Sequence, residues 1–236
     1  MHMSNTTYKV TDLRAVVIDL FHRECTPEHR YASFDYCYNY FQDASSEELK
    51  ADIEKSCLEI SFYLASWGML RGSSFLLQKS IKHYEPLVRY IIQLKEDNHP
   101  IWDIDTNSYT DKNISTLLEV YGDVTKLIIG NEKNNRHIVL TTKIILGIFG
   151  CIPAFDEYFT STFRDLCKNL PGRNGFRSVN KNSLNHIKKF YEANREEIEI
   201  LRNQIHTLDF NTSSFTNKQY SRAKIIDMYG FAKNFY

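Results

Sequence analysis

The chain has 236 residues, of which 42% are hydrophobic and 25% charged, a composition typical of a globular protein and far from that of a disordered one. Its 29 basic and 29 acidic residues give a formal net charge of zero, which argues against a large nucleic-acid footprint. We therefore predict a single domain over residues 1–236 that buries one large core.

The cysteines indicate a reducing compartment. There are five, widely spaced and without a C-x-x-C pair, a pattern of reduced thiols and not of a disulfide framework or zinc site. The first eleven residues are polar, and the longest apolar run, 138–152, contains Lys143 and is too short to span a bilayer. We expect a cytoplasmic protein with no membrane partner, metal or cofactor.

Apolar residues recur at helical spacing along most of the chain. The first such run, 13–21, follows Thr11 as its expected N-cap. Ser45 and Glu48 predict a capping box that opens a helix through about Trp67. Further helices are predicted up to residue 82 and over 87–92, 114–124, 136–150, 184–205 and after Thr216.

No segment shows the sustained alternation of a strand, so a sheet is not expected to organise the fold. The prediction is an all-α, compact multi-helix domain, of which two helical lobes with a cleft between them are one form. The polar loops 98–113 and 171–182 are the natural places for binding segments.

One segment, 142–159, combines Thr-Lys, an apolar helix that stops at Gly150, a short turn and then Pro-Ala-Phe-Asp. Pro153 is expected to start a new helix, since proline is tolerated at that position. Asp156 would then lie in the first turn, where the helix dipole favours a carboxylate. An ordinary helix-start acid explains this placement; the functional alternative is a catalytic carboxylate backed by Phe155 and Phe159.

This order of residues resembles a stretch in outlying members of the helix-hairpin-helix DNA glycosylase superfamily. The similarity rests on Thr-Lys at 142–143 and Pro-Ala-Phe-Asp at 153–156, under a tenth of the chain. It implies a helical enzyme in which Asp156 stabilises the sugar cation and orients a water molecule while a damaged or modified base leaves. The Leu-Pro-Gly-x-Gly hairpin that grips a DNA phosphate in that superfamily is not evident here.

Glycosylases that also cut the DNA backbone carry a lysine farther upstream of the aspartate. This chain has Arg136, His137 and Ile138 in that window. The resemblance therefore implies a monofunctional enzyme that only hydrolyses the N-glycosidic bond. Separately, we expect a bacterial setting, such as phage defence.

Two further stretches supply candidate substrate contacts. Aromatic residues crowd positions 31–41, and we predict that Tyr36 and Tyr38 line a base pocket together with Phe155. Ordinary core packing is the alternative for each of them.

The second stretch, 65–74, places an arginine between two glycines at a helix junction, followed by hydroxyl groups. Trp67, Arg71 and Ser73 are therefore predicted to bind substrate, because such a turn can present a guanidinium and hydroxyls to a phosphate or carboxylate. A close-packed helix corner capped by Ser73 explains the same residues.

A basic flank spans 166–191, where six Lys or Arg residues stand without a single acid. We predict phosphate contacts from Lys143, Arg173 and Arg177, so DNA is a candidate partner. A solvated loop is the alternative, and the sequence does not indicate an oligomeric state.

Two other functions stay open. A non-catalytic all-helical module would bind a protein partner and need no chemical site. The spacing of Arg23 and His29 matches the metal-free ribonuclease motif of HEPN proteins, which requires one continuous helix, and Pro27 lies within it.

Overall fold

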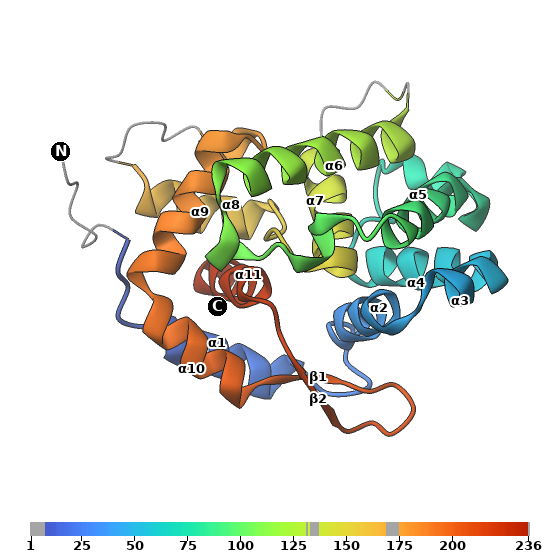
Figure 1. Cartoon of the computed structure of the whole chain (residues 1–236). Coiled ribbons are helices and arrows are strands. Elements are labelled where there is room, and N and C mark those ends of the chain that lie inside the picture. Colours follow the sequence, from blue (N-terminus) through green and yellow to red (C-terminus); the bar gives the residue numbers. More distant parts are fainter. Residues whose placement is uncertain (1–7, 131, 133–136, 169–174, 236) are drawn as a thin grey trace.

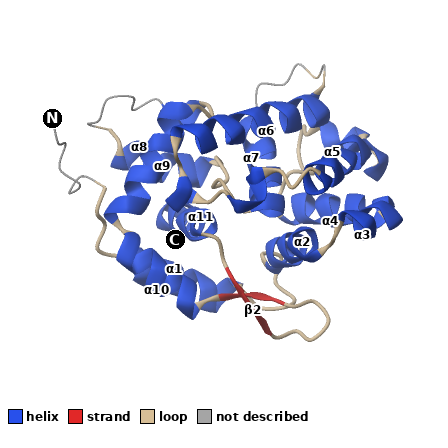
Figure 2. Ribbon diagram, viewed as in Figure 1, coloured by secondary structure: helices blue, strands red, loops and turns tan. Residues whose placement is uncertain are grey.

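The computed structural model describes residues 8–130, 132, 137–168 and 175–235. These ranges hold eleven α-helices, five short 3-10 helices and a two-stranded antiparallel sheet, which confirms the predicted all-α class (Figure 2). The α-helices are α1 (Leu13–Glu24), α2 (Ala32–Asp43), α3 (Ser46–Ala51), α4 (Ile53–Ser66), α5 (Glu85–Glu96), α6 (Asp111–Ile129), α7 (His137–Phe149), α8 (Glu157–Leu166), α9 (Lys181–Ala193), α10 (Arg195–Gln204) and α11 (Arg222–Phe235). The remaining elements are η2 (Phe75–Gln78), η3 (Ile81–Tyr84), η4 (Pro100–Asp103), η5 (Thr106–Ser108), η6 (Gly175–Arg177), β1 (His206–Leu208) and β2 (Phe215–Gln219).

Two groups of helices share one core. In the first group, α7 packs against α2, α4 and α6. In the second group, α11 packs against α8, α1 and α10 and runs through the middle of the molecule (Figure 1). Buried apolar side chains from Tyr8 to Ala232 form a continuous cluster across both groups. The chain crosses from the first group to the second between α7 and α8, and this crossing positions the site described below.

Local sequence explains the helix ends near the N-terminus. The predicted capping box of Ser45 and Glu48 is confirmed, but it opens the short helix α3. The predicted single helix is interrupted because the Asp52 side chain accepts a hydrogen bond from Lys55 N and caps a new helix, α4. At α1, Asp12 occupies the N-cap position that we predicted for Thr11.

The predicted long helix over 184–205 is wrong, since it divides into α9 and α10 at Asn194. The buried Asn194 side chain donates hydrogen bonds to Tyr8 O and Phe190 O and accepts one from Val10 N. These bonds tie the N-terminal segment to the break, and a local amide that bonds to backbone groups favours a turn over a continuous helix.

The prediction of a new helix from Pro153 is also wrong. Residues 151–156 form no helix, and α8 begins at Glu157 with Asp156 as its N-cap. Aspartate is among the strongest N-cap residues, and its side chain here accepts a hydrogen bond from Phe159 N. The predicted helix stop at Gly150 is confirmed, because Gly150 adopts φ +67° and its N–H donates to Leu146 O.

The last predicted helix starts later than expected because Phe215–Gln219 forms strand β2, which pairs with β1. Helix α2 anchors this hairpin: Asp35 accepts a hydrogen bond from Leu208 N, and Asn39 donates one to Leu208 O. Arg23 and His29 lie on α1 and in the turn after it, so the continuous helix that the HEPN motif requires is not present among these described residues.

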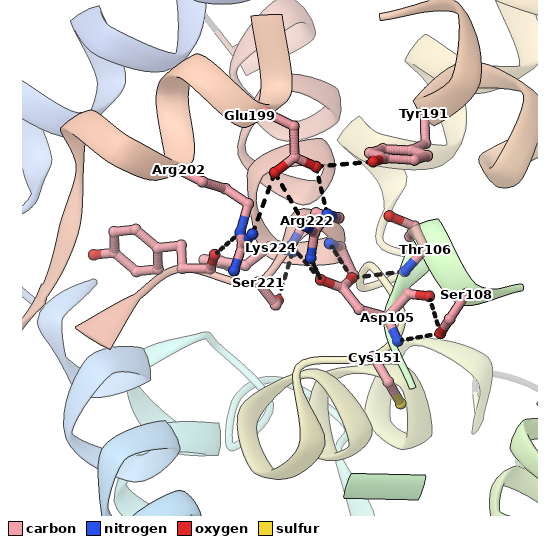
Figure 3. Close-up of polar contacts among 12 residues, drawn as sticks. Asp105, Thr106, Ser108, Cys151, Tyr191, Glu199, Arg202, Ser221, Arg222 and Lys224 are labelled. Atoms are coloured by element: carbon pink, nitrogen blue, oxygen red, sulfur yellow. Dashed lines mark hydrogen bonds and ion pairs between the residues drawn. The ribbon is translucent and has the colours of Figure 1, made fainter. Parts of the chain in front are cut away.

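Helix α11 begins on a carboxylate that comes from far upstream. Asp105 accepts hydrogen bonds from Arg222 N at 2.8 Å and Ala223 N at 3.0 Å, which caps the first turn of α11. The Arg222 guanidinium bridges Asp105 and Glu199, and Tyr191 donates to Glu199 (Figure 3). This network fixes where α11 starts, and α11 supplies two residues of the site.

Candidate functional site

Asp156 stands at the entrance to α8, where the chain enters the second group of helices. Its Oδ1 accepts the hydrogen bond from Phe159 N at 3.0 Å, and its side chain is 15% exposed. The non-helical segment before it is held by Thr142 of α7, whose hydroxyl accepts a hydrogen bond from Phe155 N at 2.9 Å. Asp156 is therefore fixed in place while keeping some access to solvent.

Lys143 of α7 faces this carboxylate. Its Nζ lies 3.4 Å from Asp156 Oδ2 and 4.7 Å from the centre of the Trp67 ring, and its side chain is 4% exposed. Burial lowers the pKa of Lys143, and the attraction to Asp156 opposes that shift. Burial raises the pKa of Asp156, which Lys143 opposes in turn. Each group favours the ionised form of the other, in a buried site that disfavours both charges.

A second buried ion pair comes from α11. Lys224 Nζ donates to Asp227 Oδ2 at 2.9 Å, and the two side chains are 6% and 5% exposed. The Lys224 ammonium lies 4.6 Å from the centre of the Trp67 ring and 4.4 Å from that of Phe34. The lysine of each ion pair thus lies against the same indole ring, that of Trp67. We name Lys143, Asp156, Lys224 and Asp227 the charge cluster.

Aromatic rings enclose the cluster. Tyr31 stacks on Trp67 with ring centres 4.6 Å apart, and Phe231 makes edge contacts with both rings. A cavity of about 20 Å³ adjoins them, enough space for one water molecule. It is lined by Leu20, Cys25, Tyr31, Phe34, Asp35, Trp67, Tyr220, Lys224, Asp227, Met228 and Phe231.

Such an arrangement is costly for a fold. Taking an ion pair out of water costs several kcal/mol per ion before the mutual attraction is counted, and an apolar pair of similar shape is often at least as stable. Burial shifts the pKa values of Lys143 and Asp156, and Lys224 and Asp227 line the cavity, so we treat this group of buried charges as the candidate functional site. The cluster pairs two cations with two anions, so it carries no net charge.

Three of the predicted site residues meet in this place: Asp156, Lys143 and Trp67. Lys143 lies there in a different role from the predicted one, because its buried ammonium pairs with Asp156 and does not face outward toward a phosphate. Phe155 lies behind the site, where its ring stacks with Phe159 in the core.

The other predicted substrate contacts lie apart from the cluster. Arg71 and Ser73 are exposed, and Ser74, not Ser73, caps the following 3-10 helix. Tyr36 donates a hydrogen bond to Pro27 O, and its ring contacts the hairpin. Tyr38 is buried and stacks on Phe34, one layer behind the cavity.

Of the predicted phosphate contacts, Arg177 is exposed on η6, and Arg173 lies outside the described residues. The neighbour of Arg177, Phe176, packs on Phe155, so η6 lies against the segment that leads to Asp156.

Sequence reasoning missed Lys224 and Asp227. A signal was present, since both charges interrupt an apolar run, Ala223 to Met228, at a spacing of three residues that places them on one face of a helix. Their closeness to Asp156 is a property of the tertiary structure.

Within the described ranges, no group of three or more His, Cys, Asp or Glu side chains could hold a metal ion. In the same ranges, no helix has both the length and the hydropathy needed to cross a membrane. No protein-family model matches the chain, and neither the curated proteins nor the solved structures include a match to it.

Proposed function

We propose that the protein is a monofunctional DNA glycosylase-like enzyme that hydrolyses the N-glycosidic bond of a damaged or modified base, with Asp156 as the catalytic carboxylate. The observation that carries this proposal is the Lys143–Asp156 pair, buried next to Trp67 at the start of a helix. The sequence resemblance around Asp156 supports the same reaction.

In this reaction the sugar develops positive charge at C1′ as the bond to the base breaks. A fixed, ionised carboxylate stabilises that charge and orients the attacking water molecule. Burial raises the pKa of Asp156, and the Lys143 ammonium opposes that shift and so favours the ionised carboxylate. The bond from Phe159 N holds one carboxylate oxygen in position. The second oxygen, Oδ2, is the one that faces Lys143.

The aromatic rings around Trp67 are suited to a flat base, which stacks on aromatic side chains once it leaves the double helix. A cavity of about 20 Å³ holds a water molecule and not a base. Substrate entry therefore requires the cavity wall to open, and Tyr158, 38% exposed and in edge contact with Phe231, lies at its outer side.

The test is release of bases from DNA. Purified protein is incubated with duplexes and single strands that carry deaminated, alkylated, oxidised or hypermodified bases, and abasic sites are counted. Asp156→Asn preserves the N-cap and removes the charge, so it should lower kcat by at least about 100-fold without weakening DNA binding. Glu157→Gln, which neutralises the exposed neighbouring carboxylate, is the matched control. Equal activity of Asp156→Asn and Glu157→Gln would contradict the proposal.

A second function has its own observation. Leu58 and Phe62 lie one turn apart on α4 and are 49% and 67% exposed, so they offer apolar side chains that a protein partner would cover. A non-catalytic interaction module would use this face and would not need the charge cluster. Loss of binding to a partner protein on Phe62→Ser, together with no base release from any substrate, would favour it.

A further inference from the structure

Two side chains from different helices hold the non-helical segment that leads to Asp156. The Thr142 hydroxyl accepts a hydrogen bond from Phe155 N, and Asp227 Oδ1 accepts one from Ala154 N, each at 2.9 Å. A segment without regular secondary structure needs such acceptors for its buried N–H groups. The place of Asp156 is therefore set partly by α11.

The carboxylate of Asp227 uses both oxygens. While Oδ1 receives Ala154 N–H, Oδ2 receives the Lys224 ammonium, one turn earlier on the same helix. The two contacts leave the carboxylate little freedom to rotate. The Lys224 ammonium is held in turn by the rings of Phe34 and Trp67.

We propose that Lys224 and Asp227 are the positioning pair for Asp156: Asp227 fixes the backbone two residues before the catalytic carboxylate, and Lys224 fixes Asp227. This inference rests on the proposed function for the role of Asp156. The hydrogen bond to Ala154 itself does not depend on which reaction Asp156 performs.

Asp227 also acts through its charge. The charged groups that act on Asp156 are Lys143 from α7 and Asp227 from α11. After burial and Lys143, the negative charge of Asp227 raises the pKa of Asp156. Neutralising Asp227 therefore lowers the pKa of Asp156, and the acid limb of the pH–rate profile moves to lower pH, because the reaction requires an ionised Asp156.

Two double variants separate position from charge. Asp227→Asn with Lys224→Met removes both charges and keeps an oxygen for Ala154 N–H. Asp227→Leu with Lys224→Met removes both charges and this hydrogen bond. We measure amide hydrogen exchange at Ala154 and Phe159, and kcat and KM across pH on the substrate found above.

We expect the Leu variant to exchange the Ala154 and Phe159 amides on the order of tenfold faster than the Asn variant. Its kcat should be about 10–100-fold below that of the Asn variant at similar KM, because misplacement of a reacting group affects the chemical step. Asp227→Asn alone should shift the acid limb to lower pH, which tests the effect of its charge. If the Leu variant does not fold, Asp227→Ala with Lys224→Met takes its place in the exchange measurement.

Equal amide exchange in the two double variants would overturn the inference that Asp227 positions the segment. An unshifted acid limb in Asp227→Asn would overturn the effect assigned to its charge. The outcome is distinguishable from failure of the proposed function. If no variant and no native protein releases a base, the reaction at Asp156 is refuted, and the amide exchange still decides whether Asp227 positions the segment.

Discussion

Asp35 is a buried carboxyl at the cavity wall that links the site to the hairpin. Its Oδ2 accepts hydrogen bonds from Leu208 N at 3.0 Å and from the Tyr220 hydroxyl at 2.8 Å. Burial raises the pKa of Asp35 to about 7, although both hydrogen bonds and the nearby Lys224 ammonium act in the opposite direction. The carboxyl therefore titrates near neutral pH.

This shift predicts a pH dependence of stability. The pKa of Asp35 in the folded protein lies above its value of about 3.9 in the unfolded chain. The contribution of the protonated Asp35 carboxyl to the free energy of unfolding is therefore full below about pH 4 and is lost as pH rises through 7. In the variant Asp35→Asn, the side-chain amide stays neutral at every pH and keeps an acceptor oxygen. The free energy of unfolding of this variant, relative to the native protein, should thus rise by up to about 4 kcal/mol between pH 4 and 7.5.

Urea unfolding at a series of pH values measures this difference. Asp43→Asn, at an exposed aspartate of the same helix, controls for the loss of a charge. Parallel stability curves for Asp35→Asn and the native protein would show that the Asp35 carboxyl does not titrate in this range.

At the scale of helices, the contact between α4 and α7 brings Trp67 to Lys143. Gly147 of α7 faces the Tyr63 ring so closely that a Cβ there would lie 2.4 Å from Tyr63 Cε1. The Tyr63 hydroxyl donates a hydrogen bond to Lys143 O at 2.9 Å. A glycine and a tyrosine thus set the spacing of the two helices that carry one half of the site.

Gly147→Ala should therefore destabilise the protein, since the added methyl group pushes α4 away from α7 at a cost of about 1–3 kcal/mol. Gly122→Ala is the matched control: Gly122 lies inside α6, and an added Cβ would meet nothing within 4 Å beyond the adjoining backbone of its own helix. Alanine should stabilise that helix by about 0.5–1 kcal/mol. Thermal unfolding of both variants checks the pair. A change of the same sign in both would contradict this account of the helix contact.

At the scale of the whole molecule, the two groups of helices share one continuous apolar cluster, and the charge cluster lies where they meet. The fluorescence of Trp67 is sensitive to the structure where the two groups meet. Trp102 packs its ring against Phe149 and Lys95, so its fluorescence is sensitive to the structure of the first group of helices.

A shared core predicts that both regions unfold together. The chain has two tryptophans, so Trp67→Phe and Trp102→Phe each leave a single fluorescent reporter. Within each variant, fluorescence and far-UV circular dichroism should give coincident urea transitions. A fluorescence transition that separates from the circular dichroism in either variant would indicate two lobes that unfold independently.

The sequence by itself determined the fold class and much of the helix pattern. Apolar spacing, the Ser45–Glu48 capping box and the stop at Gly150 act within a few residues of chain, so they can be read locally. The segment around Asp156 was also identifiable, because an acid after Pro-Ala-Phe at a helix start is a local pattern.

Only the tertiary structure decided which charges gather at the site. Lys224 lies 68 residues after Asp156, and the contact depends on how α11 packs against α8 and is capped by Asp105. The break at Asn194 likewise depends on distant backbone groups of the N-terminal segment. Hydrogen bonds and ion pairs between remote segments produce no regular spacing of residues in the sequence. The charge cluster is therefore visible only in the packed structure.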